Sequence, residues 1–116
     1  MGMATTPGNI GIAMHNDAPV SPEACSSMAE LREAIDRLDR RLVALLAQRQ
    51  RYIERAALLK QSRAAVRDEE RVEEVIAKVV AEGHKAGLSP DIAVPVWRSL
   101  IDASIVHEFG AFDRKF

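Results

Sequence analysis

The chain has 116 residues, enough for one domain at most. Its formal net charge is −1 at pH 7, so no overall basic field argues for a nucleic-acid partner. A single cysteine excludes an intrachain disulfide, and no Cys/His spacing typical of a metal site appears. No apolar run approaches the ~20 residues of a membrane span, and no secretory signal pattern is present. We therefore expect a cytoplasmic protein that uses neither a membrane nor a metal.

Residues 1–27 carry three of the five prolines and show no hydrophobic period. This composition favours a flexible N-terminal extension. Residues 28–116 are rich in Ala, Leu, Val, Glu and Arg, which favour helices. We interpret this second segment as one helical domain.

The first helix is predicted to begin at Ser27, because Ser27 and Glu30 form a capping-box pattern. Nothing breaks the pattern before about Ser62, which gives a helix roughly 50 Å long. A compact domain of this size has a radius of gyration of only ~13 Å, so the remaining chain cannot cover such a helix. The sequence therefore predicts an obligate, intertwined homodimer. The apolar stripe of this helix is Leu31, Ile35, Leu38, Leu42 and Leu45.

A second helix is predicted after a loop over residues 61–67. Asp68 is a plausible N-cap, and the acidic residues that follow it suit the helix dipole. The helix is expected to end at Gly83 or Gly87. Its apolar stripe is Val72, Val75, Ile76, Val79 and Val80.

A third helix start is indicated by Ser89 followed by Pro90 at the first helical position. Pro95 would then lie inside the helix, so either the helix begins at Pro95 or a short turn precedes it. No segment alternates like a strand, and the fold class is all-α, with three helices and a very long first one. The third stripe is Trp97, Leu100, Ile101, Ser104, Ile105, Glu108 and Phe109.

Arg49 occupies the next position of the first apolar stripe after Leu45. A guanidinium on a core-facing stripe is costly unless an anion meets it. Two interpretations stay open. A protein carboxylate pairs with Arg49, or Arg49 belongs to a site for an anionic ligand.

Glu108 and Ser104 occupy inward positions of the third stripe, one turn apart. Taken alone, Glu108 could form a buried structural salt bridge with Arg49, and Ser104 could be a small residue that lets helices approach. Taken together, the charges favour a small dianion such as a dicarboxylate. Up to four cations could converge with this one buried acid: Arg32, Arg49, Lys60 and Arg71.

The three histidines do not cluster in the sequence, and no nucleophilic triad, phosphate loop or cofactor motif appears. A site based on histidine acid/base chemistry is therefore not expected. An enzyme built from these residues would work by orienting its substrate and stabilising charge, without a cofactor.

The stretch LREAIDRLDRRLVALLAQR resembles the first-helix signature of the all-α bacterial chorismate mutases (the AroQ class). Lys60 lies eleven residues after Arg49, as in that family, and the stretch VRDEERV resembles the family's loop and second-helix start. The resemblance covers roughly residues 28–110. It implies a homodimer whose substrate is chorismate, with sites shared between protomers.

The resemblance also implies roles for the basic residues. Arg32 would reach into the partner's site and bind one substrate carboxylate, and Arg49 would bind the other carboxylate within its own protomer. Arg71 would orient the substrate. Lys60 would hydrogen-bond the ether oxygen of the breaking bond and also contact a carboxylate.

The remaining implied contacts are polar. Asp68 would contact the ring hydroxyl, and Ser104 another polar group of the substrate. Glu108 stands where many bacterial members carry Gln to bind the ether oxygen. An ionised Glu108 would repel that oxygen, so it should act as a protonated donor.

A second departure is Val72, where many members have a glutamate after the loop arginine. The Arg-Val pair, with REAIDR and RQRYI, resembles the related isochorismate-pyruvate lyases of salicylate biosynthesis. The leading interpretation is a chorismate mutase of aromatic amino acid biosynthesis. The alternatives are isochorismate-pyruvate lyase and a catalytically silent helical dimer that binds a partner or a carboxylate metabolite.

Overall fold

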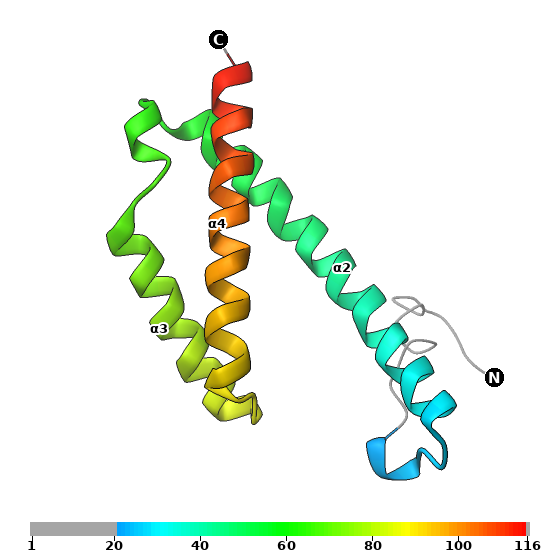
Figure 1. Cartoon of the computed structure of the whole chain (residues 1–116). Helices are drawn as coiled ribbons and strands as arrows, with labels where there is room; N and C mark the ends of the chain where they lie inside the picture. Colours follow the sequence, from blue (N-terminus) through cyan, green and yellow to red (C-terminus); the bar gives the residue numbers. More distant parts are fainter. Residues whose placement is uncertain (1–20, 116) are drawn as a thin grey trace, which may run out of the picture. The chain divides into compact units, whose positions relative to one another are not determined.

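The computed structural model describes residues 21–115, and within this range it contains three α-helices and no strand (Figure 1). The α-helices are α2 (Met28–Leu59), α3 (Glu69–Ala86) and α4 (Pro90–Arg114). Two short 3-10 helices, η2 (Pro22–Ala24) and η3 (Arg63–Ala65), complete the order. The predicted all-α class with one long helix is confirmed. The chain divides inside α2 into two compact units, Met1–Gln48 and Arg49–Phe116.

In the first unit, the start of α2 is fixed by the predicted cap. Ser27 Oγ accepts the Glu30 N–H at 3.1 Å. Glu30 Oε1 in turn accepts the Ser26 N–H at 2.8 Å, one residue earlier than a standard capping box requires. The first twenty residues of the expected flexible extension lie outside the described part of the chain. Its last residues include η2, in which the Cys25 N–H bonds to the Pro22 carbonyl.

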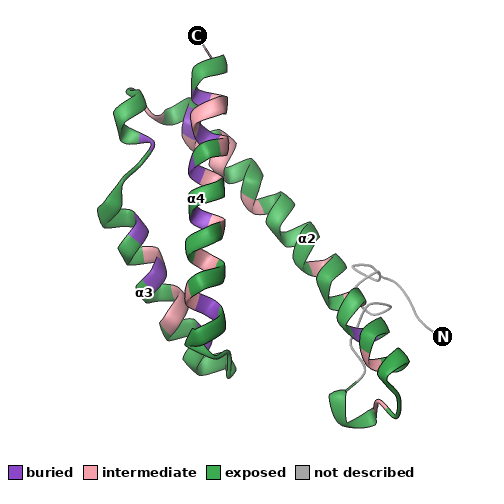
Figure 2. Ribbon diagram, viewed as in Figure 1, coloured by how far each residue is buried: buried purple, intermediate pink, exposed green. Residues whose placement is uncertain are grey.

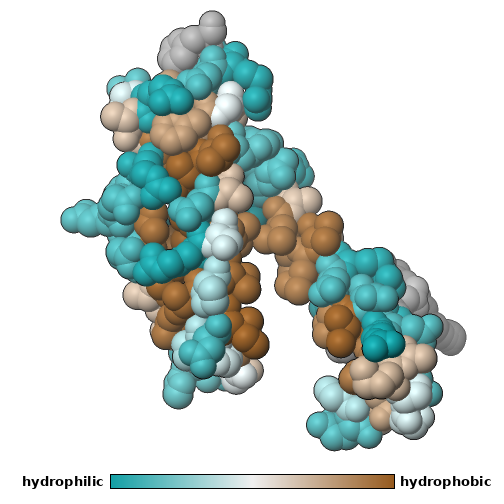
Figure 3. All heavy atoms as spheres, viewed as in Figure 1, coloured by the Kyte–Doolittle hydropathy of each residue, from teal (hydrophilic) through white to brown (hydrophobic). Residues whose placement is uncertain are grey.

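The apolar stripe of this part of α2 is largely exposed within the single chain. Side chains such as Leu42, 55% exposed, and Leu45, 58% exposed, lie on the surface of a regular helix. Figure 3 shows apolar side chains on the surface of α2. Monomeric soluble proteins rarely expose large contiguous apolar patches. The large apolar side chains exposed on this part of α2 are Met28, Ile35, Leu38, Leu42, Val43, Leu45 and Leu46.

In the second unit, α3 begins and ends where the local signals place it. Asp68 is the N-cap, and its Oδ1 accepts the Arg71 N–H at 3.2 Å. Gly87 is the C-cap with φ 81°, a left-handed conformation that glycine adopts without steric cost. Gly83, the other candidate end, stays inside the helix and is buried.

The third helix, α4, begins at Pro90 and runs straight through Pro95, so the alternative start at Pro95 is wrong. Ser89 caps the helix by accepting the Asp91 N–H at 3.1 Å. Ala93, only 1% exposed, anchors the first turn in the protein interior. The cap and this buried residue hold the first turns in place, although Pro95 cannot donate a backbone hydrogen bond.

The helices α3 and α4 pack against each other in opposite directions, joined by a short connection (Figure 1). Buried positions occur along both helices (Figure 2), and those of the predicted stripes are Val72, Ile76, Ile101, Ile105 and Glu108. The first-helix stripe also continues through Ile53, while Tyr52 is 77% exposed. The core of this unit is Ala57, Val66, Val72, Ile76, Ile101, Ile105 and Phe112.

The long helix α2 ends at Leu59, slightly earlier than the sequence predicts. No glycine or proline lies near this end, and the chain turns at Ser62, whose backbone is extended. The ending is therefore set by tertiary contacts rather than by a local breaker. None of the described helices is long and apolar enough to cross a membrane.

Candidate active site

A cavity of about 350 Å³ lies in the second unit, among the end of α2, the following loop, α3 and α4. Its volume lies in the range typical of small-molecule sites. Its apolar lining includes Ile53, Val66, Val72, Val75, Ile101 and Ile105. Six polar side chains complete the lining: Arg49, Lys60, Asp68, Arg71, Ser104 and Glu108. The structure thus brings six of the seven residues that the sequence predicts for a site around one cavity.

Lys60 and Glu108 form an ion pair across the cavity wall. Lys60 Nζ lies 2.6 Å from Glu108 Oε2, and the Glu108 side chain is only 5% exposed. Lys60 Nζ also donates to the Val66 carbonyl at 3.3 Å. An ammonium has three protons, so these two bonds leave one for a ligand. Because Lys60 comes from the end of α2 and Glu108 from α4, the pair fixes both groups beside the cavity.

Arg49 Nη1 donates to Ser104 Oγ at 2.8 Å. The proposed structural salt bridge between Arg49 and Glu108 is therefore not formed, since the Glu108 carboxylate is paired with Lys60 instead. Burial, and then the charge of Arg71, lowers the pKa of the Arg49 guanidinium from its ordinary value. Both causes disfavour the charged form of Arg49, whereas an anion bound in the cavity would favour it.

Arg71 and Asp68 line the cavity from the start of α3. The carboxylate of Asp68 is engaged by the backbone of Arg71, as described for the helix cap. Arg71 Nη1 donates to Glu74 Oε1 at 2.5 Å, and both side chains are more than half exposed. Exposed ion pairs of this kind contribute only ~0–1 kcal/mol. The guanidinium can therefore exchange Glu74 for an anion in the cavity at little cost.

Arg32 is the one predicted site residue that does not line this cavity. It belongs to the first unit and lies exposed on α2. His107 is not among the residues that line the cavity. Its Nε2 lies 2.7 Å from Glu54 Oε2.

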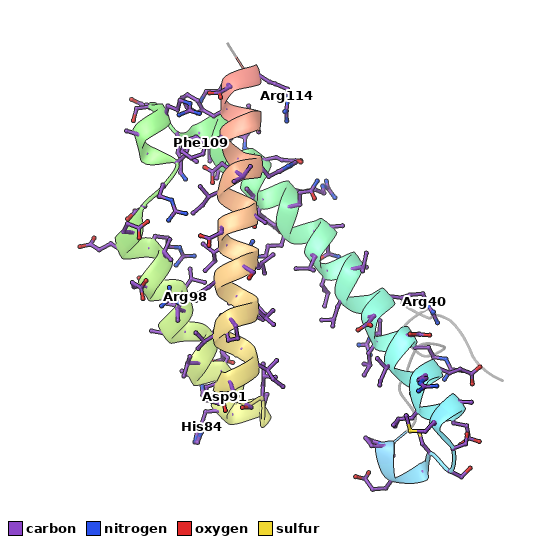
Figure 4. All side chains as sticks on the ribbon, viewed as in Figure 1. Arg40, His84, Asp91, Arg98, Phe109 and Arg114 are labelled. Atoms are coloured by element: carbon purple, nitrogen blue, oxygen red, sulfur yellow. The ribbon has the colours of Figure 1, made fainter. Side chains whose placement is uncertain are left out.

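Two loop arginines that the sequence did not single out tie the cavity wall to α4. Arg67 Nη2 donates to Asp102 Oδ1 at 3.0 Å. Arg63 Nε donates to Asp113 Oδ1 at 3.0 Å, and its guanidinium lies 4.3 Å from the centre of the Phe109 ring. Phe109 is labelled in Figure 4, at the level of this loop. The partners lie 35 and 50 residues away in sequence, so no local signal could have identified them.

Among the described residues, the cavity presents three cationic side chains, two acidic ones and the Ser104 hydroxyl on an otherwise apolar wall. Guanidinium groups suit carboxylates, and the ammonium of Lys60 suits a single oxygen that gains negative charge. Within residues 21–115, no side chain that lines the cavity is a thiol or a histidine. Such a site can bind a small dianion, fix its conformation and stabilise charge on one of its oxygens.

Comparison with known proteins agrees with this chemistry. Residues 31–109 match the family model of chorismate mutase type II. The chain is also 33% identical over 96 residues to an isochorismate pyruvate lyase of Pseudomonas aeruginosa. That alignment covers 83% of this chain and 90% of the relative.

Proposed function

Because the chain belongs to the chorismate mutase type II family, we propose that its cavity binds chorismate and rearranges it to prephenate. The observation that supports this proposal best is the convergence of Arg49, Arg71 and the Lys60–Glu108 pair on one cavity. Chorismate carries two carboxylates and an ether oxygen, which is the set of groups that these side chains complement.

The two arginines of the cavity serve the carboxylates. Arg49 is held by Ser104, and the guanidinium keeps further donors for a carboxylate. Arg71 leaves its exposed partner Glu74 for the substrate. Asp68, at the same helix start, is placed to meet the ring hydroxyl. Binding at several points holds the compact conformer from which the rearrangement proceeds, an entropic and positional contribution to the rate.

Lys60 and Glu108 serve the ether oxygen. In this intramolecular 3,3-rearrangement the breaking C–O bond leaves negative charge on that oxygen, and preorganised donors lower the barrier. The third proton of Lys60 is one donor. A Glu108 protonated on Oε1 would be the other, while its Oε2 still accepts from Lys60. The reaction needs neither a nucleophile nor a proton transfer, which agrees with the lining.

We further propose that the active form is a homodimer, in which Arg32 of one protomer reaches the partner's cavity and binds a carboxylate. The exposed apolar side chains of α2 between Met28 and Leu46 support this proposal. Burying them against a second copy would remove a large apolar surface from water, at about 25 cal/mol per Å².

A second candidate activity is the lyase reaction on isochorismate, which also breaks the ether C–O bond and releases salicylate and pyruvate. The identity to the Pseudomonas aeruginosa lyase favours it. Val72 favours it as well, because this cavity-lining residue is buried and apolar where many mutases carry a glutamate. A third possibility is a silent helical dimer that binds a partner or a carboxylate metabolite.

The purified chain offered chorismate and isochorismate in separate reactions distinguishes the three. Prephenate from chorismate supports the mutase. Salicylate with pyruvate from isochorismate alone would replace the mutase proposal by the lyase. No product from either substrate would reject both enzymes and leave the silent dimer.

A further inference from the structure

Lys115, at the C-terminal end of α4, makes a set of bonds to the end of α2. Its Nζ donates to the backbone carbonyls of Ala57 at 2.8 Å and of Lys60 at 2.6 Å. A longer bond of 3.4 Å reaches the Leu58 carbonyl. The same ammonium lies 4.2 Å from the centre of the Phe112 ring.

These carbonyls belong to the end of a helix, where backbone acceptors have no partner within the helix. The last turn of α2 contains no basic residue of its own. A cation at this end also meets the negative pole of the helix dipole. Lys115 therefore supplies from α4 the cap that the sequence of α2 lacks.

One of the capped carbonyls is that of Lys60, whose ammonium lines the cavity. The helix α4 thus contacts Lys60 twice. Lys115 holds its backbone, and Glu108 holds its side-chain nitrogen at 2.6 Å. Glu108 lies in α4, and Lys115 is the C-cap residue that directly follows this helix, seven residues later in the sequence, so together the two contacts fix where the ammonium lies.

We propose that Lys115 is a positioning residue, which fixes the end of α2 so that Lys60 meets the ether oxygen of the substrate. The catalytic part of this inference rests on the proposed function. A displacement of about 1 Å at a catalytic group can cost on the order of a hundredfold in rate. Loss of Lys115 should therefore lower kcat far more than it raises KM, because carboxylate binding by Arg49 and Arg71 is left intact.

The test compares Lys115→Met, which keeps an unbranched side chain one atom shorter and removes the ammonium, with the unmodified chain. We expect kcat to fall by about ten- to a hundredfold, with KM changed by less than about threefold. Backbone hydrogen exchange should speed up in the last turn of α2. Lys85→Met is the matched control, since Lys85 pairs with the equally exposed Glu82 and is not among the residues that line the cavity.

Chemical rescue separates positioning from general destabilisation. In a Cys25→Ser background, Lys115→Cys alkylated with bromoethylamine regains an ammonium at nearly the same distance from the backbone. Recovery of kcat and of exchange protection supports the proposal. Unchanged kcat and exchange in Lys115→Met, or a loss that alkylation does not restore, would overturn it. If the unmodified chain turned over neither substrate, the proposed function would fail, while hydrogen exchange would still decide whether Lys115 caps α2.

Discussion

Lys60 Nζ lies 2.6 Å from Glu108 Oε2, so the end of α2 and the last third of α4 meet in an ion pair at the wall of the cavity. The pair brings a donor and a buried carboxyl group to one point. Arg49 is left to hydrogen-bond Ser104, and its charge is not neutralised by Glu108. This division of partners is what makes the cavity suited to an anionic substrate.

Arg49→Ala should remove most of the turnover. We expect a loss of about 2.7–4 kcal/mol in transition-state stabilisation, the range seen when a preorganised electrostatic contact is deleted. The fold should survive, because the variant relieves a buried cation and leaves no carboxylate unpaired. A thermal melt beside a rate measurement checks this. Unfolding of the variant with full activity in any native remainder would mean that Arg49 is structural.

Glu108→Gln should keep most of the activity. The proposal needs a donor beside the ether oxygen, and the glutamine amide supplies an N–H donor of similar shape at the same place. Glu108→Ala removes the donor and should lower kcat/KM by about a hundredfold. Rate measurements on the two folded variants check this. An alanine variant as active as the glutamine variant would exclude Glu108 from the reaction and leave it as the partner of Lys60.

Glu54→Gln should reveal a small pH-dependent contribution to stability. Hydrogen bonds, first from His107 and then from Gln50, lower the pKa of the Glu54 carboxyl below its ordinary value of 4.5. A group whose pKa is lower in the folded state stabilises the fold fully above its unfolded value, and that stability is lost as pH falls through the folded value. Chemical denaturation at pH 7 and at pH 3 measures the free energy of unfolding of both proteins. The difference in this free energy between wild type and variant should be smaller at pH 3, and a larger difference there would contradict the assignment.

Leu42→Glu should disrupt self-association, because it places a charge in the exposed apolar stripe of α2. Sedimentation at micromolar concentration should show a dimer for the wild type and a smaller or unfolded species for the variant. Arg40→Glu, on an exposed and polar position two residues earlier, is the matched control and should stay dimeric. A stable folded monomer of the wild type would contradict the dimer.

The sequence was most informative about features that depend on residues close together in the chain, such as helix caps and the faces of helices. Ser27, Asp68 and Ser89 cap the three helices as expected, because an N-cap acts on backbone donors two or three residues away. The periodicity of apolar residues likewise placed Glu108 and Ser104 on the buried face of α4. Periodicity and charge singled out five of the cavity-lining residues, and the family resemblance added Asp68. The five are Arg49, Lys60, Arg71, Ser104 and Glu108.

Features set by distant contacts could not be predicted in the same way. Whether Glu108 pairs with Arg49 or Lys60 depends on how α4 meets the end of α2, and both cations line the same cavity. The end of α2 at Leu59 also has no local cause, since its carbonyls are bound by Lys115 from α4. The start of α4 was mispredicted at Pro95 for a related reason. The cap at Ser89 and the burial of Ala93 outweigh the bond that the proline removes.

Prephenate formation by the wild type beside Lys60→Met tests the central claim most directly. Methionine keeps an unbranched side chain that is one atom shorter than lysine and cannot donate a hydrogen bond to the ether oxygen. We predict that the wild type converts chorismate to prephenate, and that folded Lys60→Met does so at least about a hundredfold more slowly. No prephenate from the wild type, or an equal rate from the folded variant, would contradict the proposed site.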